Sequence, residues 1–459
     1  NYILPEELLD DIYLRMAHLH KKNYQFFQYL AWAKVNLSKD LIKHILNINN
    51  EELFNLLQDG INNELFKKIG RYYRITFSEA KLRLMRELTT NQKKEISQKI
   101  VQYFDKHKIT EIHFCENIIS HAKYLKSYGA VRKYNTILAQ IHFAKNNFYE
   151  AFLEMCNVIE LDISGKLSIS ESELKMDMSI FIDYSEWITD DQIPEKIKKM
   201  ILKMPEISEK YLLMGVYYNA MSKYNKAQKV LQKADELVFT GKAKVNVLLQ
   251  LCSVYFYKNN FYKLENCIRK LSQFKLLDED KIEYITFKYL HLGFTGKLNE
   301  SIVVLEDFIA NIKSQNDAKY LSRVASLHNV LAILYHKKKQ LDNAEKHFLF
   351  AQKIWMNLNH KKKMGVIYNN IGDVALAKGD TIKAFENFKK ALTICEQTNS
   401  KRVKVQALLN HGQAYIKLGR FFDAEHYLND ALKLSNKLES NPFHKSIIIN
   451  LAIAKSKIN

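Results

Sequence analysis

A pattern that recurs every 40 residues constrains the fold more than any other feature of this chain. Two stretches of its second half share one order of small and large residues, "IGDVALAKGDTIKAFENFKKAL" and "HGQAYIKLGRFFDAEHYLNDAL". The matching positions are Gly372, Gly379, Ala384, Phe388 and Ala391 in the first and Gly412, Gly419, Ala424, Leu428 and Ala431 in the second. Self-similarity at this period predicts a stack of equivalent helical units. Small residues on both helices of a unit let two antiparallel helices approach closely.

The pattern extends toward the N-terminus. Clear copies supply Ala332, Tyr335, Ala344, Phe348 and Ala351, and before them Gly215, Tyr218, Ala227, Leu231 and Ala234. Weaker copies centre on Tyr255, Leu264 and Leu271, on Gly296, Ser301 and Phe308, and on Ala139, Ala151 and Val158. The positions equivalent to Ala384 are 37 to 43 residues apart. These residues resemble the tetratricopeptide repeat, and the resemblance implies a right-handed superhelix with a concave inner face.

One short stretch departs from an otherwise helical sequence. The 459 residues include only 13 Gly and 4 Pro, which predicts mostly helix with short turns. In "GRYYRITFSEAKLRL", residues 70–84, aromatic and β-branched residues alternate after the glycine and predict a strand. Helices are expected before it over 6–20, in "FFQYLAWAKVNL", in "SKDLIKHIL" behind a Ser cap, and in "NEELFNLLQDG", which starts with an Asn cap and ends at Gly60. The last three of these helices, together with a hairpin that turns near Gly70, predict a winged helix.

The order of these parts resembles the region that follows the nucleotide-binding domain in STAND signalling ATPases. The resemblance rests on "LPEELLDDIYLRM", "YLAWAKVNLSKDLI", "LFNLLQDGI", "YRITFSEAKLRLMREL" and the repeats from "HAKYL" onward. It implies a winged helix that reports the nucleotide state of an ATPase and a repeat array that binds the inducer. No GxxxxGK[ST] motif is present, so the ATPase domain is missing from this chain and we expect a sensor fragment of a larger protein. The alternative is a stand-alone winged-helix transcription regulator whose repeats sense a peptide.

The expected fold is therefore an all-α repeat solenoid preceded by a small winged-helix domain with one β-hairpin. We expect a lead-in helix over 1–22, the winged-helix-like domain over 23–100, and a helical linker with the first and degenerate repeats over 101–205. Repeats follow over 206–440 and a capping helix over 441–459. In this last helix, Ala452 is expected at the small-residue position of the repeat.

Two sets of residues are expected to bind partners. In tetratricopeptide arrays the first helix of each repeat presents its inward-facing side chains to a protein or peptide. By register these are Asn329, His336, Asn369, Asp373, Gln406, Gln413 and Lys417. We expect these positions to be open to water, so that replacing Asn369 weakens binding while folding barely changes. The second set comprises Arg71, Arg74, Arg83 and Arg86, which could face an ATPase or a phosphate, or form ordinary surface pairs with Glu79 and Glu87.

Charge and motif content argue against most other functions. The formal net charge is +19, but only ten of the 69 basic residues are Arg, and dispersed Lys is typical of solvated helical faces. Binding to DNA is therefore expected to be weak and non-specific. The five cysteines form no CxxC pair and read as core residues of a reducing, cytoplasmic compartment. No catalytic triad, metal-ligand spacing or membrane-spanning apolar run is found, so no enzyme activity, metal, cofactor or membrane is expected.

Overall fold

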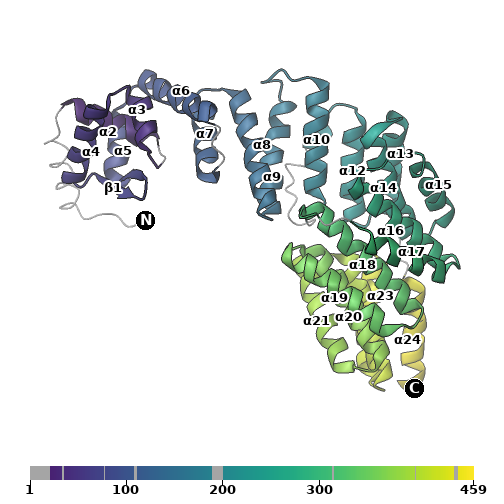
Figure 1. Cartoon of the computed structure of the whole chain (residues 1–459). Coiled ribbons are helices and arrows are strands. Elements are labelled where there is room, and N and C mark those ends of the chain that lie inside the picture. Colours follow the sequence, from purple (N-terminus) through teal and green to yellow (C-terminus); the bar gives the residue numbers. More distant parts are fainter. Residues whose placement is uncertain are drawn as a thin grey trace. The chain divides into compact units, whose positions relative to one another are not determined.

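The computed structural model describes residues 21–33, 36–76, 78–107, 111–188, 200–312, 315–398, 400–438 and 443–458 (Figure 1). The lead-in helix expected over 6–20 lies outside these residues. The chain forms two compact units. The first comprises residues up to His142 together with Leu153–Ile169, and the second comprises Phe143–Phe152 together with the residues from Ser170 onward. Each unit is described by itself.

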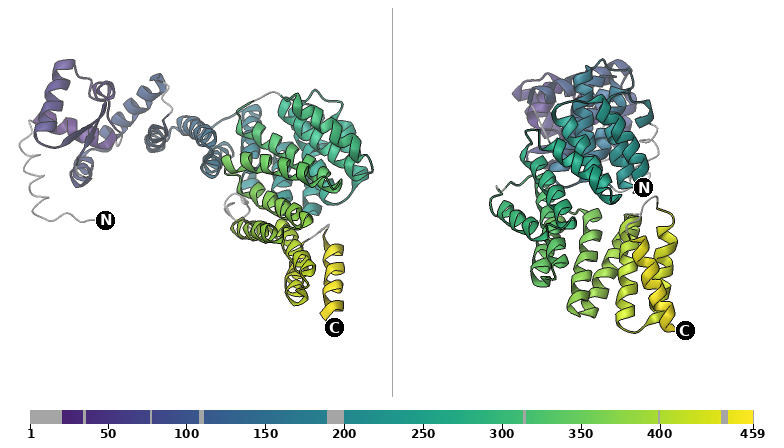
Figure 2. Two further views of the ribbon diagram at one scale, coloured as in Figure 1. Left: turned by 60° about the horizontal axis from the view of Figure 1, so that its bottom comes forward. Right: turned by 90° about the vertical axis from the view of Figure 1, so that its right-hand side faces the viewer.

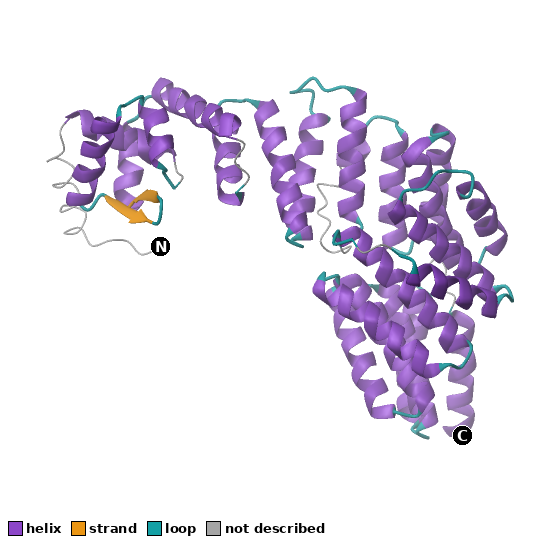
Figure 3. Cartoon of the chain, in the orientation of Figure 1, coloured by secondary structure: helices purple, strands orange, loops and turns teal. Residues whose placement is uncertain are grey.

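The first unit is a small helical core with one hairpin (Figure 3). Its elements are α2 (Lys21–Ala33), α3 (Lys39–Leu46), α4 (Asn50–Asn62), β1 (Phe66–Ile69), β2 (Tyr72–Ile75), α5 (Ser78–Glu87), α6 (Thr90–His107), α7 (Ile112–Tyr124) and the larger parts of α8 (Tyr128–Ala144) and α9 (Phe148–Asp162). Apolar side chains of α2, α3 and α4 pack with Phe66 and Tyr73 of the hairpin into one buried core. The hairpin is thus part of the core of this unit.

The predicted hairpin is confirmed. Its two strands pair antiparallel, with Phe66 opposite Ile75 and Ile69 opposite Tyr72. Gly70 begins the two-residue turn at φ +59°, the left-handed conformation that such turns require. Leu37 extends the pairing, because its backbone exchanges hydrogen bonds of 2.9 and 2.8 Å with Tyr73. The helix expected to run through Leu37 therefore ends before that residue, and α2 is described as Lys21–Ala33.

Helix caps agree with the sequence in part. Ser38 caps α3 as predicted, accepting a hydrogen bond from the backbone N–H of Leu41. The cap of α4 is Asn49, which forms a reciprocal capping box with Glu52. α4 passes Gly60, the expected end, and stops at Asn62. A Cβ atom on Gly60 would lie 2.6 Å from the Phe66 ring, so this glycine serves close packing within the helix.

The second unit is a stack of antiparallel helix pairs, seen from further directions in Figure 2. Before the pairs comes α10 (Glu171–Ser185). The first helices are α12 (Ser208–Ala220), α14 (Gly241–Tyr257), α16 (Asp278–Phe294), α18 (Ala318–Lys337), α20 (Lys361–Lys378) and α22 (Lys401–Lys417). Their partners are α13 (Tyr224–Leu237), α15 (Phe261–Leu271), α17 (Leu298–Ala310), α19 (Leu341–Asn357), α21 (Thr381–Gln397) and α23 (Phe421–Ser435). α24 (His444–Ile458) packs on α23. The predicted all-α repeat solenoid is confirmed.

The residues of the repeat pattern occupy the closest helix contacts. The six marker positions are fully buried: Ala227, Leu264, Ser301, Ala344, Ala384 and Ala424. A Cβ atom on Gly372 would lie 2.5 Å from the ring of Phe388 and 3.2 Å from the carbonyl oxygen of Ala384. Gly215 meets Leu231 and Gly412 meets Leu428 in the same way. In these three pairs the large residue of the second helix fills the space left by the glycine of its own first helix, and the register read from the sequence is correct here.

Replacing Ala384 by leucine should destabilise this unit by about 1–3 kcal/mol, because the extra carbons have no space against α20. Ile382, two residues earlier, is highly exposed and gives the matched control. Ile382→Leu should leave the thermal melting temperature unchanged. If Ala384→Leu also melts like the unmodified chain, the register is wrong.

The last helix deviates from the expected register. Ala452 was expected at the small, packed position, but it is exposed, and α24 packs through Ile447, Leu451 and Ala454 instead. The repeat pattern therefore does not extend unchanged into this helix.

Candidate functional site

A cavity of about 550 Å³ lies on the face made by the first helices. Most of its lining comes from α10, α12, α14, α16, α18, α20, α22 and the turns beside them, while α13 contributes Tyr224 and the segment after α23 contributes Lys437 and Leu438. We call the surface formed by these first helices the inner face. The residues at the end of α10 also reach it, because the Trp187 ring lies 4.6 Å from the His360 ring and the Lys362 ammonium donates to the carbonyl of Ile188 at 3.3 Å.

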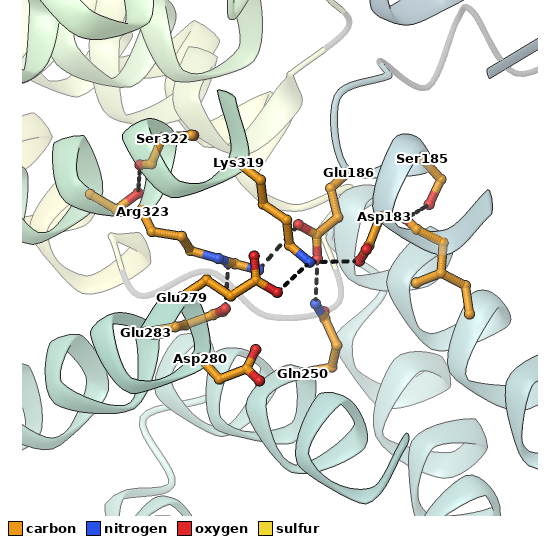
Figure 4. Close-up of polar contacts among 12 residues, drawn as sticks. Asp183, Ser185, Glu186, Gln250, Glu279, Asp280, Glu283, Lys319, Ser322 and Arg323 are labelled. Carbon is orange, nitrogen blue, oxygen red and sulfur yellow. Dashed lines mark hydrogen bonds and ion pairs between the residues drawn. The ribbon is translucent and has the colours of Figure 1, made fainter. Parts of the chain in front are cut away.

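A charged cluster forms one wall of this cavity (Figure 4). Lys319 and Arg323 extend from α18 between the carboxylates of α10 and α16. The Lys319 ammonium lies 3.0 Å from Asp183 and 3.2 Å from Glu279. Arg323 pairs with Glu283 and, at 3.5 Å, with Glu186. The cluster therefore ties three helices together across the inner face.

The spacing of these residues along the chain explains why the acids of α16 face the bases of α18. Glu279 and Glu283 are four residues apart on α16, so they lie on one side of that helix. Lys319 and Arg323 have the same spacing on α18, and each follows its partner by one repeat of 40 residues. Two acids on one first helix therefore face two bases on the next.

The cluster shifts the ionisation of its members. Burial alone would raise the pKa of Glu279, but Lys319 and Lys242 outweigh this effect and lower it. Burial also opposes charge on Lys319, yet the nearby carboxylates raise the pKa of its ammonium well above the usual range. Burial raises the pKa of Asp183 despite its ion pair. Charges in this position are retained only because they are paired.

Side-chain amides form a second polar feature farther along the inner face. The Asn370 amide donates to Asn329 at 3.0 Å, and the Asn410 amide donates to Asn369 at 3.2 Å. These bonds join α18 to α20 and α20 to α22. Asn370, which the sequence did not single out, is therefore the inner-face neighbour of Asn329.

The expected inner-face residues lie on α18, α20 and α22, and most of them are accessible. Asn329, His336, Asp373, Gln406 and Gln413 are half-buried, and Lys417 is exposed. His336 Nδ1 lies 3.8 Å from an oxygen of Asp373. The structure brings these two together across neighbouring repeats. Burial raises the pKa of Asp373, although His336 and Lys417 act in the opposite direction. Lys417 also donates to the carbonyl of Leu376 at 3.1 Å.

Asn369 differs from this group, since its exposed fraction is 0%. The expectation that it is open to water is wrong. It occupies the same repeat position as Asn329, but α20 presents the adjacent Asn370 toward the inner face. Asn369 thus belongs to the packing between α20 and α22.

We therefore expect Asn369→Ala to lower stability by about 1–2 kcal/mol, because it removes the acceptor of the buried Asn410 amide and leaves a small hole. The loss is limited, since the Asn369 amide nitrogen has no hydrogen-bond partner among the described residues. Chemical denaturation should show this change. Asn357→Ala, at an exposed end of α19, should stay within about 0.5 kcal/mol; an equal effect of both variants would contradict the assignment.

The four arginines expected to act as a set do not converge on one partner. Arg71 lies 3.4 Å from Glu111, Arg74 donates two bonds to the side chain of Asn36, and Arg83 pairs with Glu87 at 3.3 Å. Arg86 is exposed. Glu87 also accepts a bond from Tyr24 at 2.7 Å. Three of the four thus form local surface contacts, and a role in binding an ATPase or a phosphate stays a prediction.

The described residues offer little support for other kinds of site. Within the described ranges, no group of three or more His, Cys, Asp or Glu is arranged to hold a metal ion. Among the described residues, none of the five cysteines forms a disulfide bond, and four of them are buried. None of the helices described here has the length and apolar character needed to cross a membrane.

Comparison with known proteins agrees with the repeat architecture. Models of the tetratricopeptide repeat match residues 323–397 and 405–438. No curated protein matches the chain significantly. One similar structure is a Signal Transduction ATPase with Numerous Domains (STAND) with a tetratricopeptide repeat sensor, from Pyrococcus horikoshii. It shares 14% identity at a TM-score of 0.30, over 99% of this chain and 56% of that protein.

A second similar structure is a Rap protein complexed with Competence and Sporulation Factor, with 13% identity and a TM-score of 0.46 over 71% of this chain and 98% of that one. A third is a Rap conjugation gene regulator in complex with the Phr* peptide, with 13% identity and a TM-score of 0.41 over 72% and 96%. The chain spans little more than half of the STAND protein.

Proposed function

We propose that this chain is a cytoplasmic sensing arm that binds a protein or peptide on its inner face, without chemistry of its own. The observation that carries the proposal is the concentration of accessible polar groups on the first helices. The cavity, the charged cluster and the Asn329–Asn370 pair all lie there. An extended backbone offers donors and acceptors that such side chains can match.

The first unit would relay binding to an ATPase or effector domain. Support comes from the sequence resemblance to the region after the nucleotide-binding domain of STAND ATPases. The order of α2, the Leu37 bridge, α3, α4 and the hairpin agrees with the three helices and hairpin expected of a winged helix. The ATPase contact and the relay are parts of the proposal.

The alternative, a regulator that binds DNA, has less support. α4 precedes the hairpin, as a recognition helix does in a winged helix, yet it carries Glu51, Glu52 and Asp59 and no Lys or Arg. Acidic groups would be repelled by DNA phosphates. A sequence-dependent gel shift that survives physiological salt, and is lost on replacing Arg71 and Arg74 by alanine, would favour this alternative.

Selection from a random peptide library displayed on phage tests the proposed function. The full chain is the target, and a selected peptide is then synthesised and its affinity measured. Asn370→Ala and Gln413→Ala should each weaken binding by about 1–3 kcal/mol, if their amides bond to the peptide. Asn357→Ala and Gln397→Ala, at exposed ends of second helices, should bind like the unmodified chain. Equal affinities for all four variants would contradict the proposal.

A further inference from the structure

The lining of the inner-face cavity is strongly basic. Its lining includes eight Lys and Arg side chains but only two carboxylates, those of Glu186 and Glu283. Both carboxylates pair with Arg323, at the charged cluster. Lys363 on α20 and the first residues of α22 also line the cavity, and the Lys363 ammonium is near enough to Glu283 to oppose the rise that burial causes in the pKa of that carboxyl. The lining as a whole therefore carries an excess of positive charge.

Arg402 is the central residue of this basic lining. Its guanidinium carbon lies 3.8 Å from the centroid of the Tyr257 ring. The contact with the ring and a side-chain hydrogen bond to Tyr257 hold the guanidinium in place, and its remaining N–H groups can bond to a planar anion. Among the ion pairs of the described residues, none involves Arg402 or Lys363. Arg402 is therefore a half-buried arginine that an aromatic ring holds in place. It forms no ion pair with a carboxylate of the described residues, so it can bind the carboxylate of a ligand.

The lowered pKa values of two neighbouring groups indicate the same positive potential. Arg402, with help from Lys363, lowers the pKa of the Tyr257 hydroxyl although burial opposes this. Burial, together with Lys363 and Lys362, lowers the pKa of His360 well below its usual range and keeps that ring neutral. α22 begins at Lys401, and its cap residue Ser400 makes no side-chain hydrogen bond to the helix. The free N–H groups of this first turn add partial positive charge.

We propose that Arg402, Lys363 and the first turn of α22 form an oxyanion-binding subsite that takes a carboxylate of an acidic peptide. This inference rests on the proposed function and names the chemistry of its ligand. An arginine fork can bind a carboxylate through two parallel N–H···O bonds, which are stronger than neutral hydrogen bonds. A phosphate presents the same chemistry.

Fluorescence anisotropy of labelled pentaglutamate with the full chain at low ionic strength tests the subsite. Labelled pentalysine is the charge control, and unlabelled inorganic phosphate is the competitor. Pentaglutamate should bind, pentalysine should not, and salt should weaken the binding. Arg402→Gln should reduce the affinity for pentaglutamate about tenfold or more, and Lys363→Gln should reduce it as well. Arg269→Gln, an exposed arginine on α15, should have no effect.

Thermal melting of each variant shows whether it is folded. If Arg402→Gln does not fold, the affinity of Lys363→Gln for pentaglutamate tests the subsite. Competition by phosphate that depends on Arg402 supports a subsite for oxyanions from either source. Failure of phosphate to compete, with Arg402 still required, assigns the subsite to peptide carboxylates. Unchanged affinity in both variants, or equal binding of pentalysine, would overturn the proposal. These probes do not depend on a peptide selected from the phage library, so the two proposals can fail separately.

Discussion

Phe388→Ala is expected to lower the free energy of unfolding of the second unit by about 3–5 kcal/mol, the range typical of a fully buried aromatic side chain. Phe388 has an exposed fraction of 0%, and its ring fills the space beside Gly372. The ring also lies 5.3 Å from the ring of His411 on α22. Truncation would therefore open a cavity between α20, α21 and α22.

Repeat arrays need not unfold in one step, so the measurement should resolve individual helices. Hydrogen exchange at increasing denaturant should show earlier opening of α20 and α21 in Phe388→Ala. Phe422→Ala is the matched control, because Phe422 lies near the start of α23 and is 74% exposed. It should change stability by no more than about 0.5 kcal/mol. Similar effects of the two substitutions would show that Phe388 does not occupy a core position.

Lys319→Ala should cost roughly 2–3 kcal/mol of stability. Breaking a fully buried ion pair costs about 3–5 kcal/mol, because the remaining charge is left unpaired. The cost is discounted here, since the side chains of Asp183 and Glu279 are 32% and 25% exposed. Lys353→Ala, at an exposed position of α19, is the control and should be close to neutral.

A second substitution separates charge from packing. Lys319→Ala leaves Asp183 without its ammonium partner, whereas Glu279 keeps Lys242 at 3.1 Å. Adding Asp183→Asn removes the unpaired carboxylate, so the double variant should recover part of the stability. Urea denaturation of the two variants and the control measures this coupling. If Lys319→Ala unfolds like Lys353→Ala, the cluster does not hold α10 against α16 and α18.

The repeat core could be predicted from the sequence because its signal is local and recurs. Ala384, Gly372 and Phe388 identify one helix contact, and the same residue types return one repeat later. The hairpin was equally clear, since Gly70 and alternating residues define it within a few positions. Both features depend on neighbours in the sequence or on a fixed period.

Features that depend on distant segments were missed. The predicted helix does not reach Leu37, because Leu37 pairs with Tyr73, and nothing in the α2 sequence shows this. Asn369 and Asn370 differ in burial because adjacent residues point in different directions around α20. The repeat period of 40 does not show which of the two faces the inner face. The charged cluster joins Lys319 to Asp183 across 136 residues. The part of the cluster on α16 and α18 could have been predicted from the sequence, because Glu279 and Lys319 share one repeat position. The carboxylates that α10 contributes could not have been predicted in this way.

The central claim is that the inner face, rather than the outer surface of the array, binds the partner. Its most direct test is photo-crosslinking of the full chain with a phage-selected peptide that carries benzoylphenylalanine at one end, followed by mass spectrometry. We expect the cross-links to fall on α14, α16, α18, α20 or α22. The second helices offer the opposing result, because Ile382 on α21 and Phe422 on α23 are exposed apolar side chains available to a peptide. Cross-links confined to those helices, or to the first unit, would contradict the claim.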